Sequence, residues 1–145
     1  TFTLKAKATA LPASTVGVAS AFYFGRQAKF AGNRVFADWT VTVIMDENDF
    51  LPGGAKGQLE MWSGMINSHI GNIRNSSFVP PLGYMRDGQV IQYGKSGDVV
   101  GNYQMSQCFP IDVGAIPVDW SANDSIAEFS VTFSMQYWTS LASVD

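Results

Sequence analysis

The sequence has few charged residues. They make up 14% of its 145 residues, whereas soluble domains usually carry about 25%. A surface this short of charge indicates extensive contacts between subunits rather than a fully solvated monomer. The net charge of -3 argues against binding nucleic acid by counterion release, which needs a cluster of Lys and Arg.

Cysteine and histidine are also scarce, with Cys108 and His69 the single examples. One cysteine cannot form an internal disulfide, and one histidine cannot build a multi-histidine metal site. The apolar, strand-like setting of Cys108 predicts a buried, unreactive thiol. His69 lacks a Ser or Cys partner signature, so a structural or surface role is expected. The charge-free stretch 8–25 holds Pro12 and Gly17 and is a poor membrane span, so we expect a soluble protein without a membrane anchor.

Two segments resemble catalytic or cofactor-binding motifs, but their residues do not have the spacing that those motifs require. Residues 94–96 (GKS) resemble the end of a phosphate-binding loop, but Gln89 holds the place of the required glycine and no helix follows. A hairpin turn is therefore predicted there. Residues 46–49 (DEND) are not followed by the glycine of a calcium loop, which predicts a solvated acidic turn. We expect no enzyme, no cofactor and no metal site.

Strand patterns dominate the first part of the chain. Residues 2–8 alternate between apolar and polar types, which predicts a half-buried strand. Segments 16–24 and 28–36 are typical of the two arms of a hairpin, with Gly25 near the tip and a bulge or second turn at 32–33.

The remaining strands follow the same reasoning. Segment 39–45 (WTVTVIM) gives the strongest signal, because β-branched residues fill most of its positions. Segments 89–93 and 98–109 predict a second hairpin. Segment 113–118 predicts a short edge strand interrupted by a proline. Apolar and polar residues alternate over the whole of 126–138, which predicts one long strand.

A single segment has helical periodicity. Leu59, Trp62, Ile66 and Ile70 recur at spacings of three and four, which predicts a helix over 55–70. Together, the predicted strands and helix indicate a mainly β protein, an antiparallel β-sandwich or barrel with one short helix packed on it. We expect residues 1–145 to form a single domain.

Two of the four tryptophans, Trp39 and Trp120, directly follow an aspartate. At a strand end the carboxylate of Asp38 or Asp119 can cap backbone amides while the indole enters the core, so both tryptophans are expected to be structural. A carbohydrate-binding sandwich is the alternative, with four tryptophans as sugar platforms: Trp39, Trp62, Trp120 and Trp138.

Three longer stretches carry a family resemblance. They are 7–14 (KATALPAS), 30–49 (FAGNRVFADWTVTVIMDEND) and 118–138 (VDWSANDSIAEFSVTFSMQYW), with the predicted helix between the second and third. In order and spacing they resemble the tail tube protein of contractile-tailed bacteriophages over nearly the whole chain. Family members carry an N-terminal segment before the first strand, and we expect it to be absent here.

The resemblance implies a structural function. Family members form hexameric rings that stack into a rigid hollow tube inside a contractile sheath, and DNA is ejected into the host through the bore without specific binding. The implied partners are further copies of the chain, the sheath protein, and baseplate and tail-terminator proteins at the tube ends. The implied location is the virion tail, after assembly in the host bacterial cytoplasm. A tube-initiator or terminator protein, or the inner tube of a related contractile injection or secretion system, is the alternative.

The composition agrees with this function. A strand-rich surface with little charge suits sheets that continue between the subunits of a ring, because such pairing closes exposed strand edges. An acidic chain suits a bore through which a polyanion slides without sticking.

Charge is distributed unevenly along the chain. Residues 1–75 hold seven Lys or Arg against five Asp or Glu, a balance of +2, and residues 76–145 hold two against seven, a balance of −5. An interface that propagates into a filament joins two different faces, which such a split suits. The hairpin 22–36 is therefore expected to pack on a neighbouring subunit. Six candidate interface residues follow, the first three basic and the last three acidic: Arg26, Lys29, Arg34, Asp98, Asp112 and Asp124.

Overall fold

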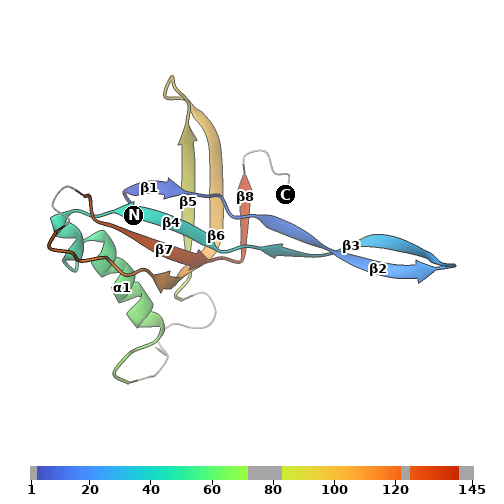
Figure 1. The fold of residues 1–145 in the computed structure, drawn as a ribbon, viewed down its shortest axis with the longest axis horizontal. Coiled ribbons are helices and arrows are strands. Elements are labelled where there is room, and N and C mark those ends of the chain that lie inside the picture. The colour runs from blue at the N-terminus through green and yellow to red at the C-terminus, as the bar shows by residue number, and fades with distance from the viewer. Residues whose placement is uncertain (1–2, 72–82, 122–124, 141–145) are drawn as a thin grey trace.

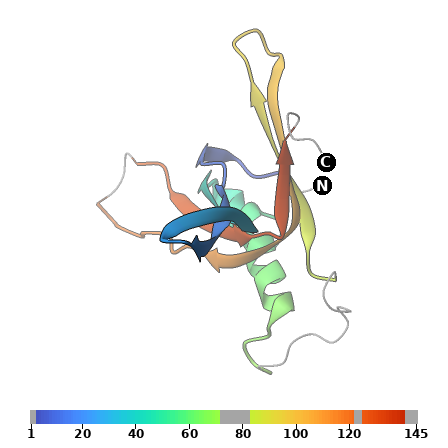
Figure 2. The same ribbon diagram turned by 90° about the vertical axis from the view of Figure 1, so that its right-hand side faces the viewer.

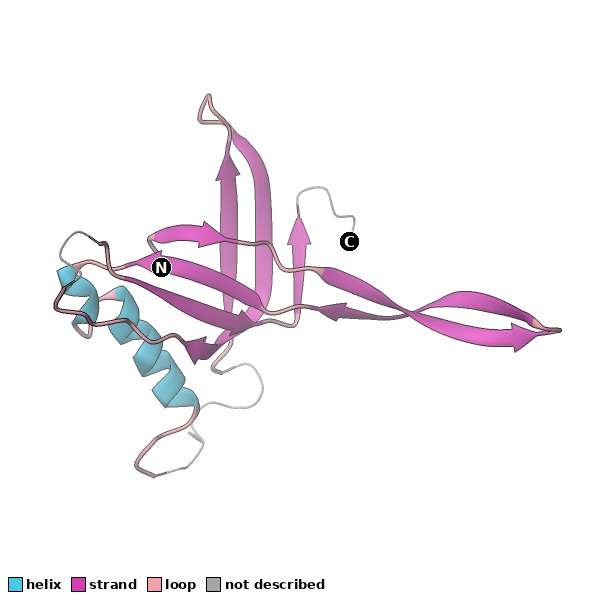
Figure 3. Cartoon of the chain, in the orientation of Figure 1, coloured by secondary structure: helices cyan, strands magenta, loops and turns pink. Residues whose placement is uncertain are grey.

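The computed structural model describes residues 3–71, 83–121 and 125–140. Within these ranges the chain is mainly β with one α-helix, as the sequence predicts (Figures 1 and 3). In chain order the elements are β1 (Ala6–Thr9), β2 (Ser14–Tyr23), β3 (Arg26–Phe36), β4 (Trp39–Ile44), the 3-10 helix η1 (Glu47–Phe50), α1 (Ala55–Ile66), β5 (Arg86–Tyr93), β6 (Val99–Val113), β7 (Glu128–Ser134) and β8 (Tyr137–Ser140).

The centre of the fold is the antiparallel pair β4 and β7, which stays in register from Trp39 opposite Phe133 to Ile44 opposite Glu128. Strand β1 pairs with the outer side of β4, and β6 pairs with the outer side of β7. Because side chains alternate between the two faces of a sheet, one face of this pair is apolar and buried. Its six residues are Trp39, Val41, Val43, Phe129, Val131 and Phe133.

Strand β6 is long enough to belong to two sheets. Its last part, 109–113, pairs with β7, whereas its first part pairs with β5 on one side and β8 on the other. The change of direction lies at Gln107, which has a positive φ of 56° and donates its N–H to the Asp87 carboxylate at 3.0 Å. Met105 of the second sheet is fully buried in the core. The two sheets therefore form one curled, antiparallel half-barrel around a shared core.

Helix α1 covers part of the same apolar face. Leu59 is fully buried, and the Trp62 ring lies 6.1 Å from that of Phe133 while its indole N–H donates to the Tyr84 carbonyl at 2.7 Å. The predicted extension of this helix to Ile70 is wrong. The helix ends at Ile66, and Ile70 lies fully exposed in a turn, where no core surface supports another helical turn.

The predicted half-buried strand over 2–8 is wrong in its burial. Strand β1 begins at Ala6, and all four of its residues are exposed because it is an edge strand that pairs only with β4. Leu4, before the strand, packs against the core. Residue 2 lies outside the described residues.

Two strand predictions near the C-terminus also need correction. Strand β6 ends at Val113, and the segment after it is irregular rather than an edge strand, since Pro117 has no N–H to donate. The single strand expected over 126–138 is divided into β7 and β8. The division occurs because β7 pairs with β4 and β6, whereas β8 pairs with the other half of β6. The two predicted hairpins are confirmed.

The two tryptophans that follow aspartates have different environments. Trp39 is 7% exposed, stacks 5.3 Å from the Phe133 ring and donates to the Thr9 hydroxyl at 2.7 Å, so its structural role is confirmed. The prediction that the Trp120 indole enters the core is wrong, because this side chain is 98% exposed in a loop outside the sheets. Asp119 does cap the backbone: it accepts hydrogen bonds from the N–H and hydroxyl of Ser121, which lower its pKa.

The acidic segment 46–49 is a turn whose first three residues are solvated, as predicted, but whose fourth residue is buried and caps the backbone. Asp49 is buried, and its carboxylate accepts hydrogen bonds from the N–H of Asp46 at 2.7 Å and of Ala55 at 3.3 Å. The bond from Asp46 is the main cause that lowers the pKa of Asp49 below its ordinary value, against the opposing effect of burial. One carboxylate thus fixes η1 to the start of α1.

Replacing Trp39 by Ala is expected to lower the free energy of unfolding by about 3–5 kcal/mol, because a large cavity opens in the core. The matched control is Trp120→Ala, which should change it by less than about 0.5 kcal/mol in the isolated subunit. Denaturant unfolding of both variants measures the difference. Equal costs at the two positions would contradict the placement of Trp39.

Replacing Asp49 by Ala is expected to lower the free energy of unfolding by about 1–3 kcal/mol at pH 7, because one buried and one partly buried N–H group lose their acceptor. A carboxyl group whose pKa is lowered on folding stabilises the native state above its unfolded pKa, near 3.8. That stabilisation is lost as the pH falls through the lower folded pKa. The difference between wild type and variant should therefore shrink in denaturant unfolding below this pH, and a constant difference down to strong acid would disprove the role.

Candidate assembly surfaces

The β2–β3 hairpin leaves the body of the fold as a separate two-stranded sheet (Figure 1). Its tip is the two-residue turn Phe24–Gly25, in which both residues have positive φ, 47° and 75°. This is the pattern of the type I′ turn that matches the strand twist, and Gly25 lies at the tip as predicted. The predicted bulge is confirmed where Gly17 faces 32–33. A side chain on Gly32 would lie 3.1 Å from the Gly17 carbonyl oxygen, so the two backbones meet closely there.

The hairpin is apolar but uncovered. Phe22, Phe24 and Phe30 are 79%, 96% and 61% exposed, and Val18 and Val35 are exposed as well. A two-stranded hairpin is marginally stable on its own in water, and contiguous exposed apolar surface marks an interaction site. In Figure 2, which looks along the hairpin, the helix and both sheets lie behind it. The hairpin therefore has the character of a segment that another molecule covers.

The three basic candidates all lie on β3. Arg34 donates to the Ser14 hydroxyl across the hairpin at 2.8 Å, whereas Lys29 pairs in register with Ser20 and Arg26 with Tyr23 near the tip. All three are exposed.

The acidic candidates lie elsewhere. Asp98 is in the turn between β5 and β6 and accepts a hydrogen bond from Ser96, and Asp112 is exposed on β6 opposite Thr132. Asp124 lies outside the described residues. The ion pairs of the described residues involve other groups, namely Lys5–Asp46, Lys7–Glu128 and Lys56–Glu60. Within one subunit the structure therefore does not bring the three basic candidates together with Asp98 or Asp112.

The sheet β1–β4–β7–β6 has two strand edges that no described strand covers. One is the outer edge of β1, and the other is the side of residues 109–113 of β6 that faces away from β7. The pairing of β5 with β6 reaches only to Arg86 opposite Cys108. Unpaired edges of this kind readily pair with a strand of another chain.

Sequence reasoning missed three exposed apolar side chains. Val118, Trp120 and Ile126 lie in the segment between β6 and β7 and are largely exposed. The sequence signals that could have found them are Gly114 and Pro117, which end the strand before these residues.

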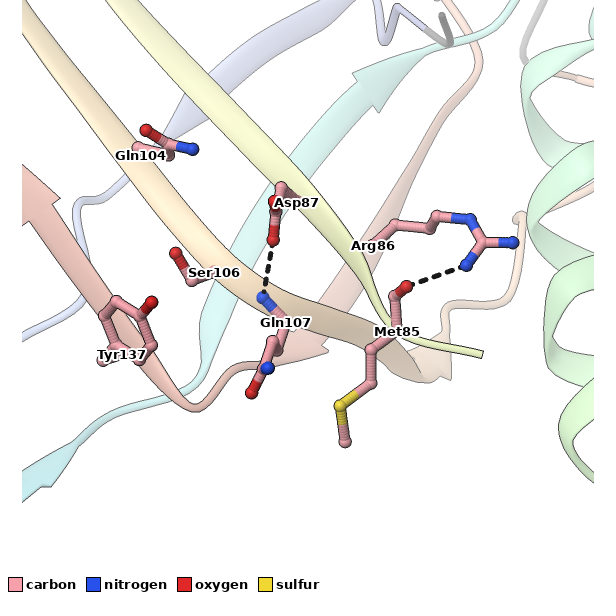
Figure 4. Close-up of a pocket in the computed structure, with 7 residues that line it drawn as sticks. All are labelled: Met85, Arg86, Asp87, Gln104, Ser106, Gln107 and Tyr137. Carbon is pink, nitrogen blue, oxygen red and sulfur yellow. Dashed lines mark hydrogen bonds between the residues drawn. The ribbon is translucent and has the colours of Figure 1, made fainter. Parts of the chain in front are cut away.

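The remaining polar candidates are a hollow, Cys108 and His69. A hollow of 440 Å³ is lined by residues such as Met85, Tyr137 and Asp87, but the Asp87 carboxylate is bound to the Gln107 N–H (Figure 4). Cys108 is buried as predicted, and burial is the main reason that its pKa rises to about 11. His69 is exposed in a turn.

Within 3–71, 83–121 and 125–140, no group of three or more His, Cys, Asp or Glu residues is arranged to hold a metal ion. No helix of these ranges has the length and apolar character needed to cross a bilayer.

Relatives of known name share the sequence and the fold. The chain is 32% identical over 138 residues to the tail tube protein gp19 of Enterobacteria phage T4, covering 94% of this chain and 80% of that one. It superposes with TM-scores of 0.69 and 0.67 on chains from the sheath/tube terminator and the sheath–tube complex of the extracellular contractile injection system PVC, in the extended state. Both are 16% identical, with 94% and 95% of this chain and 85% and 81% of those chains covered. Residues 1–141 match the family described as phage tail tube protein. With its sequence and its fold in agreement, the chain belongs to the phage tail tube protein family and has a structural, tube-forming role.

Proposed function

We propose that this chain assembles into hexameric rings that stack into the inner tube of a contractile phage tail. The observation that carries the proposal is the β2–β3 hairpin, whose large apolar side chains are exposed in the single subunit. These side chains can be buried only by a second molecule. Because the chain belongs to a family of tube proteins, we take that molecule to be another copy of the chain.

Ring closure follows from the strand directions. Each neighbouring pair in β1–β4–β7–β6 is antiparallel, so the two outer strands of this four-stranded unit run in opposite directions. A rotation about the ring axis places the free edge of residues 109–113 beside the β1 edge of the next subunit, again antiparallel. Every subunit then uses two different edges, and the pairing closes without leaving a free edge.

The hairpin is proposed to pack on a subunit of a neighbouring ring. Its length carries the tip beyond the body of the fold (Figure 1). Exposed cations on β3 would then meet exposed acids on the neighbour, which aligns successive rings head to tail. The proposed partners are Arg26, Lys29 and Arg34 on one side and Asp98, Asp112 and Asp124 on the other.

The further partners are proposed from the relatives. A sheath around the tube and a terminator at its end match the assemblies named for the superposed chains, and a baseplate holds the other end. DNA passes through the bore, in a virion tail assembled in the host cytoplasm, and the protein performs no catalysis.

A tube initiator or terminator is the second candidate, because a chain from a sheath/tube terminator superposes as well as a chain from a sheath–tube complex.

Negative-stain electron microscopy of the purified protein tests the proposal. Tubes of stacked rings with a central channel are the expected result. Single rings that do not stack would favour the initiator or terminator function, and monomers at all concentrations would refute both.

Deleting the hairpin tip, Gly25–Lys29, is expected to leave a folded subunit that does not build tubes, because the covering contact is lost. Phe22→Ser should have the same effect more mildly. Met61→Ser removes an exposed apolar side chain of α1 and serves as the matched control. Circular dichroism checks folding and electron microscopy checks assembly; full-length tubes from the deletion variant would show that the hairpin is not an assembly element.

Reversing Arg26, Lys29 and Arg34 to Glu is expected to slow polymerisation, and reversing Asp98, Asp112 and Asp124 to Lys should partly rescue it. Exposed pairs contribute only about 0–1 kcal/mol each, but the effect repeats in every subunit. Light scattering follows the rate, which should also fall for the wild type as salt shortens the Debye length from about 10 Å at 0.1 M to about 3 Å at 1 M. An assembly rate unaffected by the first set of reversals would argue against charge-guided stacking.

A further inference from the structure

Trp138 on β8 has an indole N–H that is buried without a hydrogen-bond partner. Among the buried side-chain nitrogen and oxygen atoms of the described residues, its Nε1 is the one that has no partner. The indoles of Trp39 and Trp62, by contrast, each donate to an oxygen 2.7 Å away. A buried tryptophan N–H usually finds an acceptor, and a buried donor left without one costs free energy. The unpaired donor of Trp138 therefore requires an explanation.

The Trp138 indole lies where the β2–β3 hairpin joins the body of the fold (Figure 1). The ring of Phe36, the last residue of β3, packs edge to face against it with centroids 6.3 Å apart, and Tyr103 of β6 packs against it at 6.1 Å. An aromatic face accepts an N–H only weakly, so neither ring replaces an oxygen acceptor.

The two neighbouring rings differ in how firmly they are held. Tyr103 is fixed from both sides, because β6 pairs there with β5 and with β8. Phe36 belongs to a two-stranded sheet that pairs with no other described strand. Phe36 is therefore the neighbour of Trp138 that moves when the hairpin changes its angle to the body.

A second copy of the chain can approach Trp138 along β8. Among the described strands, β8 pairs with β6 alone, and a strand edge of this kind readily receives another chain. The uncovered apolar hairpin begins beside this strand (Figure 1). A copy that covers the root of the hairpin therefore also comes close to the Trp138 indole.

We infer that Trp138 is a contact residue for an adjoining copy of the chain, to an oxygen of which its indole N–H donates once the Phe36 ring has shifted. This inference rests on the proposed tube. In the free subunit the N–H is covered and unpaired. When the hairpin docks on a neighbour, its root turns with it and uncovers the indole. The subunit then gains a hydrogen bond that it lacks when free, which favours the assembled form.

Two Trp→Phe variants test the state of this N–H in the free subunit. Trp138→Phe and the matched control Trp62→Phe both keep an aromatic ring at a partly buried position and both remove an indole N–H. In the control the Tyr84 carbonyl also loses its donor, so its folding equilibrium constant should fall about fivefold further than that of Trp138→Phe. Denaturant unfolding below the concentration at which tubes form measures both constants. Equal losses would show that the Trp138 N–H already has a partner and would overturn the inference.

The assembly of the same variants tests the contact with the adjoining copy. Trp138→Phe should raise the lowest concentration at which tubes form by at least about fivefold, because the new hydrogen bond is lost. Trp62→Phe should leave this concentration unchanged once it is expressed per folded subunit. Sedimentation of the tubes measures both. Assembly of Trp138→Phe at the wild-type concentration would disprove the inference while the tube remains, whereas a wild type that forms no tubes counts against the proposed function itself.

A measurement on the wild type keeps the test independent of how the variants fold. Hydrogen bonding moves the proton signal of an indole N–H downfield in ¹H–¹⁵N nuclear magnetic resonance spectra. The Trp138 signal should lie upfield of those of Trp39 and Trp62 in the free subunit and move downfield in tubes, while the other two keep their positions. A Trp138 signal at the same position in both states would contradict a donor that finds its acceptor on assembly.

Discussion

The structure depends on the burial of one face of the β4–β7 pair. Val41, Val43 and Val131 are almost completely inaccessible to solvent, and Trp39 and Phe133 stack beside them. Two other elements cover this face: α1 places Leu59 on it, and the first half of β6 places Met105 there. Because a sheet has two faces and the core uses one, the opposite face of the same strands is left for another purpose.

Among the described residues, a core of this kind leaves two kinds of surface without a partner. The outer edges of β1 and of residues 109–113 of β6 are unpaired, and the aromatic side chains of the β2–β3 hairpin are exposed. A free strand edge is completed by another strand, and an exposed apolar surface is completed by another apolar surface. In the proposed tube these surfaces become the contacts within a ring and the contacts between rings.

Three carboxylates of the described residues hold the backbone at the ends of regular elements. The Asp49 carboxylate fixes the start of α1, the Asp87 carboxylate fixes the bend of β6, and the Asp119 carboxylate caps a turn. Burial is the main cause that raises the pKa of the Cys108 thiol to about 11. Each of these carboxylates fixes the backbone at a place where a regular element ends or bends. Fixed backbone at these places helps every subunit present the same surfaces to its neighbours.

Local pattern by itself determined the strands, both hairpins, the tip at Gly25, the burial of Trp39 and Cys108, and the family resemblance. These features depend on neighbouring residues, because alternation and turn chemistry act over a few positions. Tertiary structure alone decided the end of α1 before Ile70, the exposure of β1 and Trp120, the division of 126–138 into two strands, and the burial of Asp49. Each of these depends on whether a distant segment covers the residue or pairs with it. The candidate charges show the same limit: their positions along the chain are readable from the sequence, but within one subunit the structure does not pair the basic candidates of β3 with Asp98 or Asp112.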